Sequence, residues 1–133
     1  MIKLSSVEAS HCFTYRVYFE DTDLMGIVYH ANYLCFFERA RTEMLRDNGF
    51  SLTTMATYDT HFAIHDIHMR FLYPARLDDV LSIKTSYERK KTCSLMFNQL
   101  MYNQLGQLLS EASIQVVCVN SKLKPRRLPT ILV

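Results

Sequence analysis

The chain has 133 residues, of which 49% are hydrophobic, 21% charged and 12% aromatic. This composition excludes a disordered chain, and at about 150 residues per domain the length predicts one domain over residues 1–133. No apolar run reaches the roughly 18 residues that a membrane-spanning helix needs, and residues 1–10 lack the apolar core of a secretory signal. The sequence therefore predicts a soluble, cytoplasmic protein without membrane insertion.

Charge is unevenly divided along the chain, although the net charge is only +2. Residues 1–79 carry 7 basic and 11 acidic side chains, whereas residues 80–133 carry 8 basic and 2 acidic ones. A total of +2 is too small to indicate duplex nucleic acid as a partner, and the basic half favours a phosphorylated small molecule. The 4 cysteines form no C-x-x-C pair, which predicts buried free thiols in a reducing compartment.

The hydrophobic pattern predicts one long helix among five strands. Apolar residues recur at helical spacing from about Ala31, which indicates a helix of some 18 residues, and Gly49 follows as its expected C-terminal cap. Opposite charges at helical spacing predict surface ion pairs. These are Glu38 with Arg41, Arg39 with Glu43, and Glu43 with Arg46. Period-two alternation predicts strands over 13–19, 67–73, 81–87, 93–102 and 108–119.

The order strand, helix, four strands predicts an α+β fold. Because the connections after the helix are short, the five-stranded sheet should be mostly antiparallel, with the helix crossing one face. One helix leaves the other face and both edges uncovered, and an uncovered edge invites aggregation. A homodimer is therefore expected, joined through edge strands or through stacked faces that bear the helix.

An acidic stretch lies between the first strand and the helix. From Tyr18 to Asn32 it reads Y-F-E-D-T-D-L-M-G-I-V-Y-H-A-N, with carboxylates at Glu20, Asp21 and Asp23. Mutual repulsion and partial burial should raise the pKa of at least one carboxylate, as a general base or nucleophile requires. The free N–H groups of the helix start come next and can hold an oxyanion. The alternative is that these residues only form caps and turns.

This stretch, continued as Y-L-C-F-F-E-R-A-R-T-E, resembles the signature of the hotdog-fold thioesterases, in the 4-hydroxybenzoyl-CoA thioesterase family and within it the YbgC type. The segment 74–80, P-A-R-L-D-D-V, is similar to that family's turn between the second and third strands. The resemblance covers most of the chain and implies a hotdog fold, with the sheet wrapped on one long helix. It also implies hydrolysis of acyl-CoA to a free acid and CoA, with coenzyme A as part of the substrate and with no cofactor. Related proteins further imply that the homodimer pairs into a homotetramer with the site at a subunit boundary.

The resemblance also implies roles for individual residues. It places the catalytic carboxylate on Asp23, as base or nucleophile, and the His30 backbone N–H on the thioester oxygen. Gly26, Val28 and Tyr29 lie between them and are the implied substrate contacts. Proteins of this type often carry tyrosine at the position of Phe19, so no catalytic tyrosine hydroxyl is expected there.

Other charged residues leave alternatives open. Arg89, Lys90 and Lys91 match the basic run that meets the phosphates of coenzyme A in the family, and the alternative is a solvated charge run. Glu38 is a rival base, because some hotdog thioesterases place the carboxylate on the helix. Residues 122–133 are the predicted tail, in which Arg126 and Arg127 either also meet the phosphates or are only solvated. No metal site is predicted, since His65 and His68 face opposite sides of a strand.

The charge pattern also fits a second class of function. A non-catalytic module would bind acyl-CoA or an acyl carrier protein and act through partners in lipid or envelope metabolism. The YbgC type is associated with the Tol–Pal envelope system, which keeps this alternative open. The sequence leaves undetermined the acyl chain and whether it arrives on CoA or on a carrier protein.

Overall fold

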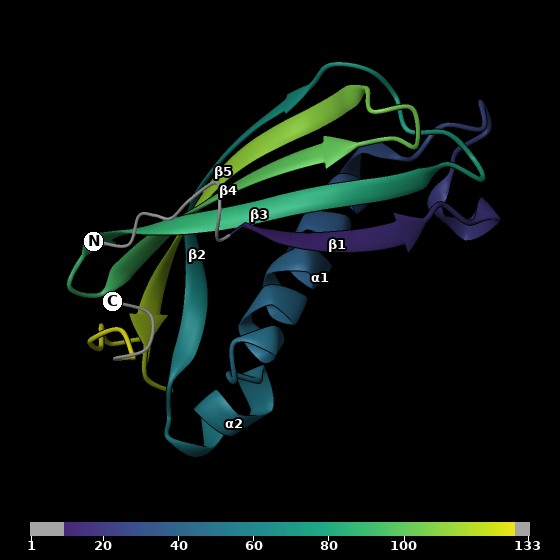
Figure 1. Ribbon diagram of the computed structural model, residues 1–133. Coiled ribbons are helices and arrows are strands. Elements are labelled where there is room, and N and C mark those ends of the chain that lie inside the picture. The colour runs from purple at the N-terminus through teal and green to yellow at the C-terminus, as the bar shows by residue number, and fades with distance from the viewer. Residues whose placement is uncertain (1–9, 130–133) are drawn as a thin grey trace.

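Five antiparallel strands form one sheet in the order β1-β3-β4-β5-β2. The computed structural model describes residues 10–129 of the chain. The strands are β1 (His11–Arg16), β2 (His61–Phe71), β3 (Val80–Lys91), β4 (Ser94–Tyr102) and β5 (Leu108–Val119). Helix α1 (His30–Asp47) crosses the concave face, and the sheet curves around it (Figure 1). This arrangement confirms the predicted α+β class.

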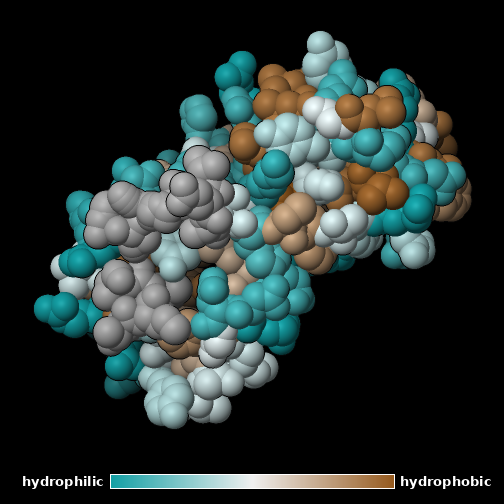
Figure 2. All heavy atoms as spheres, viewed as in Figure 1, coloured by the Kyte–Doolittle hydropathy of each residue, from teal (hydrophilic) through white to brown (hydrophobic). Residues whose placement is uncertain are grey.

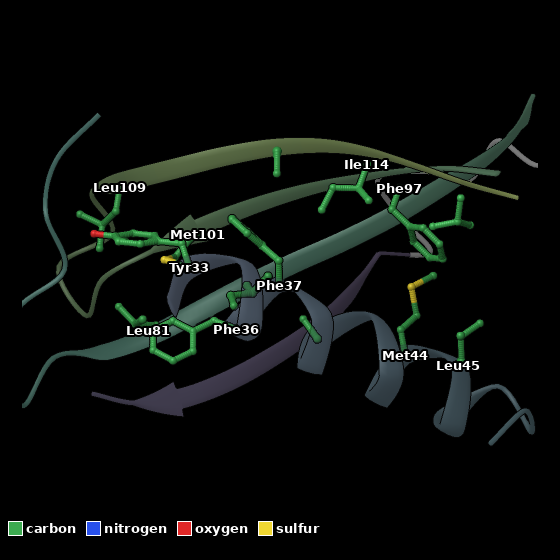
Figure 3. Packing of buried hydrophobic residues seen from close by; sticks show 14 of the residues in the cluster. Tyr33, Phe36, Phe37, Met44, Leu45, Leu81, Phe97, Met101, Leu109 and Ile114 are labelled. Carbon is green, nitrogen blue, oxygen red and sulfur yellow. The ribbon is translucent and has the colours of Figure 1, made fainter. Parts of the chain in front are cut away.

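The core lies between α1 and the inner face of the sheet. Period-two alternation buries every second residue of β4, and the helical period of α1 turns one stripe inward. Figure 3 shows the rings of Phe36 and Phe37 lying between the helix and the strands, with Phe97 and Ile114 on the sheet side. The buried residues of α1 are Tyr33, Phe36, Phe37, Ala40, Arg41, Met44 and Leu45.

Helix α1 has the predicted length and the predicted end. It contains 18 residues, and Gly49 follows its C-cap with a φ of 90°, a conformation that costs glycine no steric strain. The Phe50 N–H then donates to the Leu45 carbonyl at 2.8 Å, which folds the chain back onto the last turn. None of the helices within residues 10–129 has the length and apolar content needed to cross a bilayer.

Two short helices were not predicted. Strand β1 ends at Arg16 instead of residue 19, and the 3-10 turn η1 (Phe19–Asp21) follows it. Helix α2 (Leu52–Thr57) follows α1. Ser51 caps α2 by accepting a hydrogen bond from the Thr54 N–H at 3.1 Å, and Met55 is its buried residue. A six-residue helix with one buried side chain is too short for a periodic signal.

Strand β2 differs from its prediction because it is an edge strand. It begins at His61 instead of residue 67 and ends at Phe71 instead of residue 73. Most of its side chains are exposed, and its register shifts between Ile64 and Asp66. Because no residue of β2 is fully buried on either face, apolar and polar residues need not alternate in its first half. The other strands lie close to their predicted ranges, and β5 matches its range at both ends.

Side-chain predictions on the surface were partly wrong. Of the three ion pairs predicted along the helix, only Glu43–Arg46 is formed, at 3.3 Å. Arg39 instead lies over the ring of Tyr15, at 5.2 Å from the centroid, and Arg41 is buried with 9% exposure. Competing contacts with the sheet therefore displace two of the pairs.

The cysteines are free, as predicted, but not all are buried. Cys118 is buried and Cys93 half-buried, whereas Cys12 and Cys35 are exposed. The prediction of burial is wrong for the last two because they lie on solvent-facing sides of β1 and α1.

Candidate active site

The acidic stretch folds as a tight hairpin before α1. Thr22 and Val28 form an isolated antiparallel bridge, and the Asp23 N–H donates to the Ile27 carbonyl at 2.9 Å. The Gly26 N–H donates to the Asp23 carbonyl at 3.0 Å, and Gly26 has a φ of 75°. Because a side chain at this φ would be strained, glycine is the residue that lets the turn close. Gly26 therefore shapes the loop around Asp23.

The turn between β2 and β3 holds this hairpin from the other side. The Val28 N–H donates to the Ala75 carbonyl at 2.8 Å, and the Leu77 N–H donates to the Gly26 carbonyl at 3.1 Å. The Ala75 N–H donates in turn to the buried Tyr33 hydroxyl at 2.9 Å. The segment 74–80 therefore supports the loop that carries Asp23.

Asp21 and Asp23 have opposite environments. Asp21 is buried with 6% exposure, and its Oδ2 accepts hydrogen bonds from the Tyr15 hydroxyl at 3.1 Å and from the Tyr18 N–H at 2.9 Å. Burial raises the pKa of Tyr15, although Arg39 acts against this shift. The Asp21 carbonyl also accepts from the Tyr29 N–H at 3.0 Å, at the start of α1. Asp21 is therefore an anchor of the turn.

Asp23 is exposed at the surface of the loop. Its Oδ1 accepts a hydrogen bond from the Met25 N–H at 2.8 Å, which fixes the carboxylate in the turn. Large apolar side chains around it are also exposed: Phe19 by 80%, Leu24 by 107% and Met25 by 73%. Figure 2 shows apolar surface gathered at this end of the molecule. The carboxylate is thus positioned by backbone and open to a ligand.

His30 opens α1 with its backbone donor free. The N-cap residue Tyr29 provides no side-chain cap, and among residues 10–129 no hydrogen-bond acceptor is found for the His30 N–H. His30 and Val28 line a groove of about 360 Å³ together with Tyr33, Phe71 and the start of the β2–β3 turn. The exposed Tyr29 ring lies beside the His30 ring, with centroids 4.5 Å apart. Of the predicted site residues, Val28 and His30 therefore line this groove, whereas Asp23, Gly26 and Tyr29 lie outside its lining; Asp23 is bonded to the lining residue Ile27.

The basic run lies at the opposite end of the sheet. β3 pairs with β1 next to the Asp23 loop through Arg16 and Val80, and Arg89 to Lys91 form the other end of β3. The ten residues from Val80 to Arg89 are separated by nine extended steps of about 3.3 Å, which span about 30 Å. A single chain thus does not bring the predicted phosphate contacts to Asp23.

The predicted basic tail is attached to the domain over its described part, residues 122–129. The Leu128 N–H donates to the Thr92 carbonyl at 3.1 Å, so Lys122, Lys124 and Arg127 belong to the same end as the basic run. Arg126 is structural, because its Nη1 donates to the Tyr58 and Asp59 carbonyls at 2.7 and 3.0 Å. Residues 130–133 of the predicted tail lie outside the described residues.

A second cavity, of about 340 Å³, lies between α1, α2 and β2. Glu38, the rival base, is an exposed residue on its wall, away from the Asp23 loop. The buried Arg41 lines the same cavity. The sequence predicted a surface ion pair for Arg41, so its burial was missed. Its position among the inward-facing residues of α1 is the signal that could have indicated this burial.

Comparisons with known proteins agree on one family. The family model of the thioesterase-like superfamily matches residues 17–131. The acyl-CoA thioester hydrolase YbgC of Escherichia coli O6:H1 is 46% identical over 119 residues, which cover 89% of each chain. The acyl-CoA thioesterase YbgC of Haemophilus influenzae is 42% identical over 120 residues, covering 88% of this chain and 87% of that one. The crystal structure of a probable thioesterase from Bartonella henselae has a TM-score of 0.86 at 39% identity, covering 90% and 99% of the two chains.

This chain therefore belongs to the thioesterase-like superfamily. The likeness to the Bartonella structure, together with the antiparallel sheet and α1, confirms the predicted hotdog fold. The relatives also confirm the resemblance to the YbgC type and the predicted enzyme class, a thioester hydrolase.

Proposed function

We propose that this protein hydrolyses acyl-CoA thioesters, with Asp23 as the catalytic carboxylate and the His30 N–H as the oxyanion donor. The observation that carries the proposal is the exposed Asp23 carboxylate on a loop tied by hydrogen bonds to the start of α1. At that helix start, the free N–H and the positive end of the helix dipole favour a developing negative charge. The names of the YbgC relatives support acyl-CoA as the substrate class.

Two routes fit a carboxylate at this position. Asp23 attacks the thioester carbon, the carbon–sulfur bond breaks, CoA leaves as thiolate, and water then hydrolyses the mixed anhydride. Alternatively, Asp23 takes a proton from a water molecule, which attacks the same carbon. In both routes the negative charge forms on the carbonyl oxygen, where the His30 N–H donates to it. The thiolate leaves without a strong acid, because a thiol pKa of about 8.5 makes the thiolate a good leaving group.

The groove beside His30 is the proposed seat of the thioester. Val28 and Phe71 supply apolar walls, and the exposed Tyr29 ring lies beside the ring of His30, which lines the groove. Gly26 leaves the backbone beside Asp23 without a side chain, so a substrate can approach closely. Coenzyme A is part of the substrate in this proposal, and no metal or further cofactor takes part. An acyl carrier protein is the alternative carrier of the same thioester.

A symmetric dimer would complete the site. Strand pairing brings one set of residues to the same end of the sheet in a single chain. His61 pairs with Val119, Ser94 pairs with a residue two positions before Val119, and Lys91 pairs with Ser94. Phe71, beside the His30 groove, lies at the other end. If two exposed β2 edges pair antiparallel around a two-fold axis, the end with Lys91 in one chain approaches the His30 groove of its partner.

This arrangement gives the basic run a role. Across the dimer, Arg89, Lys90 and Lys91 of one chain can meet the phosphates of CoA whose thioester lies at the partner's Asp23. These side chains are exposed, and they form the end of β3 next to its turn into β4. The excess of basic residues in the second half of the chain supports the same assignment.

The first test is the isosteric substitution Asp23→Asn. Release of free thiol from short, long and aromatic acyl-CoAs should fall at least about a hundredfold, the typical contribution of a catalytic acid or base. The melting temperature should change little because the side chain is exposed. Measuring thiol release from each substrate for wild type and variant would also identify the preferred acyl class.

Two matched variants make this test specific. Glu20→Gln removes an exposed carboxylate three residues away and should keep the activity. Glu38→Gln removes the rival base and should retain turnover of simple acyl groups. Full activity in Asp23→Asn, or a hundredfold loss in Glu38→Gln alone, would contradict the assignment to Asp23.

A further inference from the structure

The cavity between α1, α2 and β2 combines apolar walls with one buried cation. Its volume is about 340 Å³, and Leu45, Phe62, Ile64, Phe97 and Val116 form most of its apolar lining. Arg41 lines the same space and is 9% exposed. An apolar cavity with a few polar groups is the usual form of a small-molecule site.

Arg41 has a single hydrogen bond to protein in the described part of the chain. Its Nη1 donates to Gln99 Oε1 at 3.1 Å, and the amide of Gln99 donates to the Phe37 carbonyl at 2.9 Å and to Thr85 Oγ1 at 3.0 Å. The network therefore holds the guanidinium in place with a neutral partner. A guanidinium has five N–H donors, so most of those on Arg41 have no protein acceptor.

These remaining donors are not sealed inside the protein. Within residues 10–129, the side-chain nitrogen and oxygen atoms that are fully buried without a hydrogen bond are His11 Nδ1 and Ser94 Oγ. Nε and Nη2 of Arg41 are not among them, so they retain access to solvent through the cavity that Arg41 lines. Burial lowers the pKa of Arg41, while the charge of Glu38 opposes this shift. The side chain is thus a largely buried cation, and no carboxylate of residues 10–129 forms an ion pair with it.

From this arrangement we propose that Arg41 recognises an oxygen atom at the distal end of the acyl group, so that the enzyme prefers acyl chains ending in a carboxylate or a hydroxyl. The guanidinium has one neutral acceptor in Gln99, and a ligand oxygen that accepts its remaining donors adds charge-assisted hydrogen bonds at a largely buried site. The apolar walls would hold the methylene groups between the thioester and that oxygen.

This inference rests on the proposed function and on the proposed dimer. The cavity borders the His61 end of β2, whereas the His30 groove borders the Phe71 end. Antiparallel pairing of two β2 edges places these ends side by side across the two-fold axis. An acyl chain whose thioester lies at Asp23 in one chain can then extend toward Arg41 of its partner.

Other charged groups around the cavity also affect which ligand charge is favoured. Glu38 lies on the same wall as Arg41, and its carboxylate would repel an anionic end. His61 lies on the opposite wall, with its Nε2 at 3.4 Å from Asp59 Oδ1. A carboxylate and a hydroxyl share the oxygen acceptor that Arg41 requires, and the ligands below distinguish them.

The test measures binding independently of turnover. Non-hydrolysable thioether analogues of glutaryl-CoA, 5-hydroxypentanoyl-CoA and pentanoyl-CoA are titrated calorimetrically into the wild-type protein, with the adipyl and suberyl series covering longer chains. At one chain length or more, an oxygen-bearing ligand should bind about tenfold or more tightly than its plain counterpart. Arg41→Met should abolish this preference and leave the affinity for the plain ligand almost unchanged.

Control variants and turnover separate this inference from the proposed function. Arg46→Met, the same substitution on the exposed side of α1, should keep the preference, and Arg41→Lys should keep part of it. Equal affinity for oxygenated and plain ligands at every length in wild type would overturn the inference without relying on a variant. An equal loss for all ligands in Arg41→Met would also overturn it. Retained preference with no thiol release from the parent thioesters would contradict only the proposed hydrolysis.

Discussion

At the scale of single residues, neighbouring carboxylates of one motif have separate tasks. Asp21 accepts hydrogen bonds from Tyr15 and Tyr18 in the interior, and Asp23 lies exposed two positions later. The 3-10 turn η1 produces this difference, because it turns one side chain inward and leaves the loop after it at the surface. The resemblance had implied catalysis at Asp23 only, and the burial of Asp21 adds a physical reason to treat the two carboxylates differently.

Asp21→Ala tests this division. It leaves the Tyr15 hydroxyl and the Tyr18 N–H without their acceptor, so the free energy of unfolding should fall by about 1–3 kcal/mol. Denaturant titration followed by circular dichroism measures the change. Asp23→Ala is the matched control and should alter stability by less than about 0.5 kcal/mol. Equal stability losses in the two variants would contradict the assigned roles.

At the scale of elements, buried polar groups fix α1 on the sheet. Gln99 of β4 is 1% exposed and bonds both the Phe37 carbonyl and the Arg41 side chain of α1, and Thr85 of β3. Apolar packing alone allows helix positions that differ by small shifts, whereas these bonds select one. The helix start, and with it the His30 N–H, is positioned by this contact and by the bonds around Asp21.

Gln99→Leu should therefore be costly although leucine is apolar and of similar size. It removes the acceptor of the Arg41 guanidinium and the donor that bonds the Phe37 carbonyl and Thr85 Oγ1, and we expect a loss of about 2–3 kcal/mol in the free energy of unfolding. Thermal and urea denaturation measure it. Asn98→Leu, at the adjacent half-buried position bonded to Ser113, should cost less than half as much. A neutral effect of Gln99→Leu would show that the network does not hold the helix.

At the scale of the whole molecule, strand β2 is the element that a single chain leaves incomplete. It forms an edge of the sheet, and Ile64, Ile67 and Phe71 are exposed by 51%, 42% and 50%. Exposed apolar residues on an unpaired edge favour association. The same association would unite the Asp23 end of one chain with the basic end of another.

Ile67→Glu tests this assembly. A charge at the edge of each chain would oppose its copy near the two-fold axis, so the protein should become monomeric in sedimentation velocity and lose thiol release together with the dimer. Leu105→Glu places the same charge at a residue exposed by 84% in the β4–β5 turn and should leave both unchanged. An active monomer would contradict a site shared between chains.

The sequence by itself determined the regular elements and the position of the motif. The length of α1, its Gly49 cap and the bounds of β5 followed from local periodicity and turn chemistry, which act over a few residues. The stretch around Asp23 and His30 was also readable, because its residues are adjacent in the chain. Features with weak periodicity, α2 and the first half of β2, were missed for the same reason.

Only the tertiary structure decided which charged side chains are structural and which are available. Arg41 and Arg126, read as surface charges, are bonded to groups distant in sequence, and Asp21 is buried whereas Asp23 is open. The tertiary structure also places Arg89–Lys91 far from Asp23 within one chain. Such outcomes depend on contacts between segments brought together by the sheet, and local spacing in the sequence carries no information about those contacts.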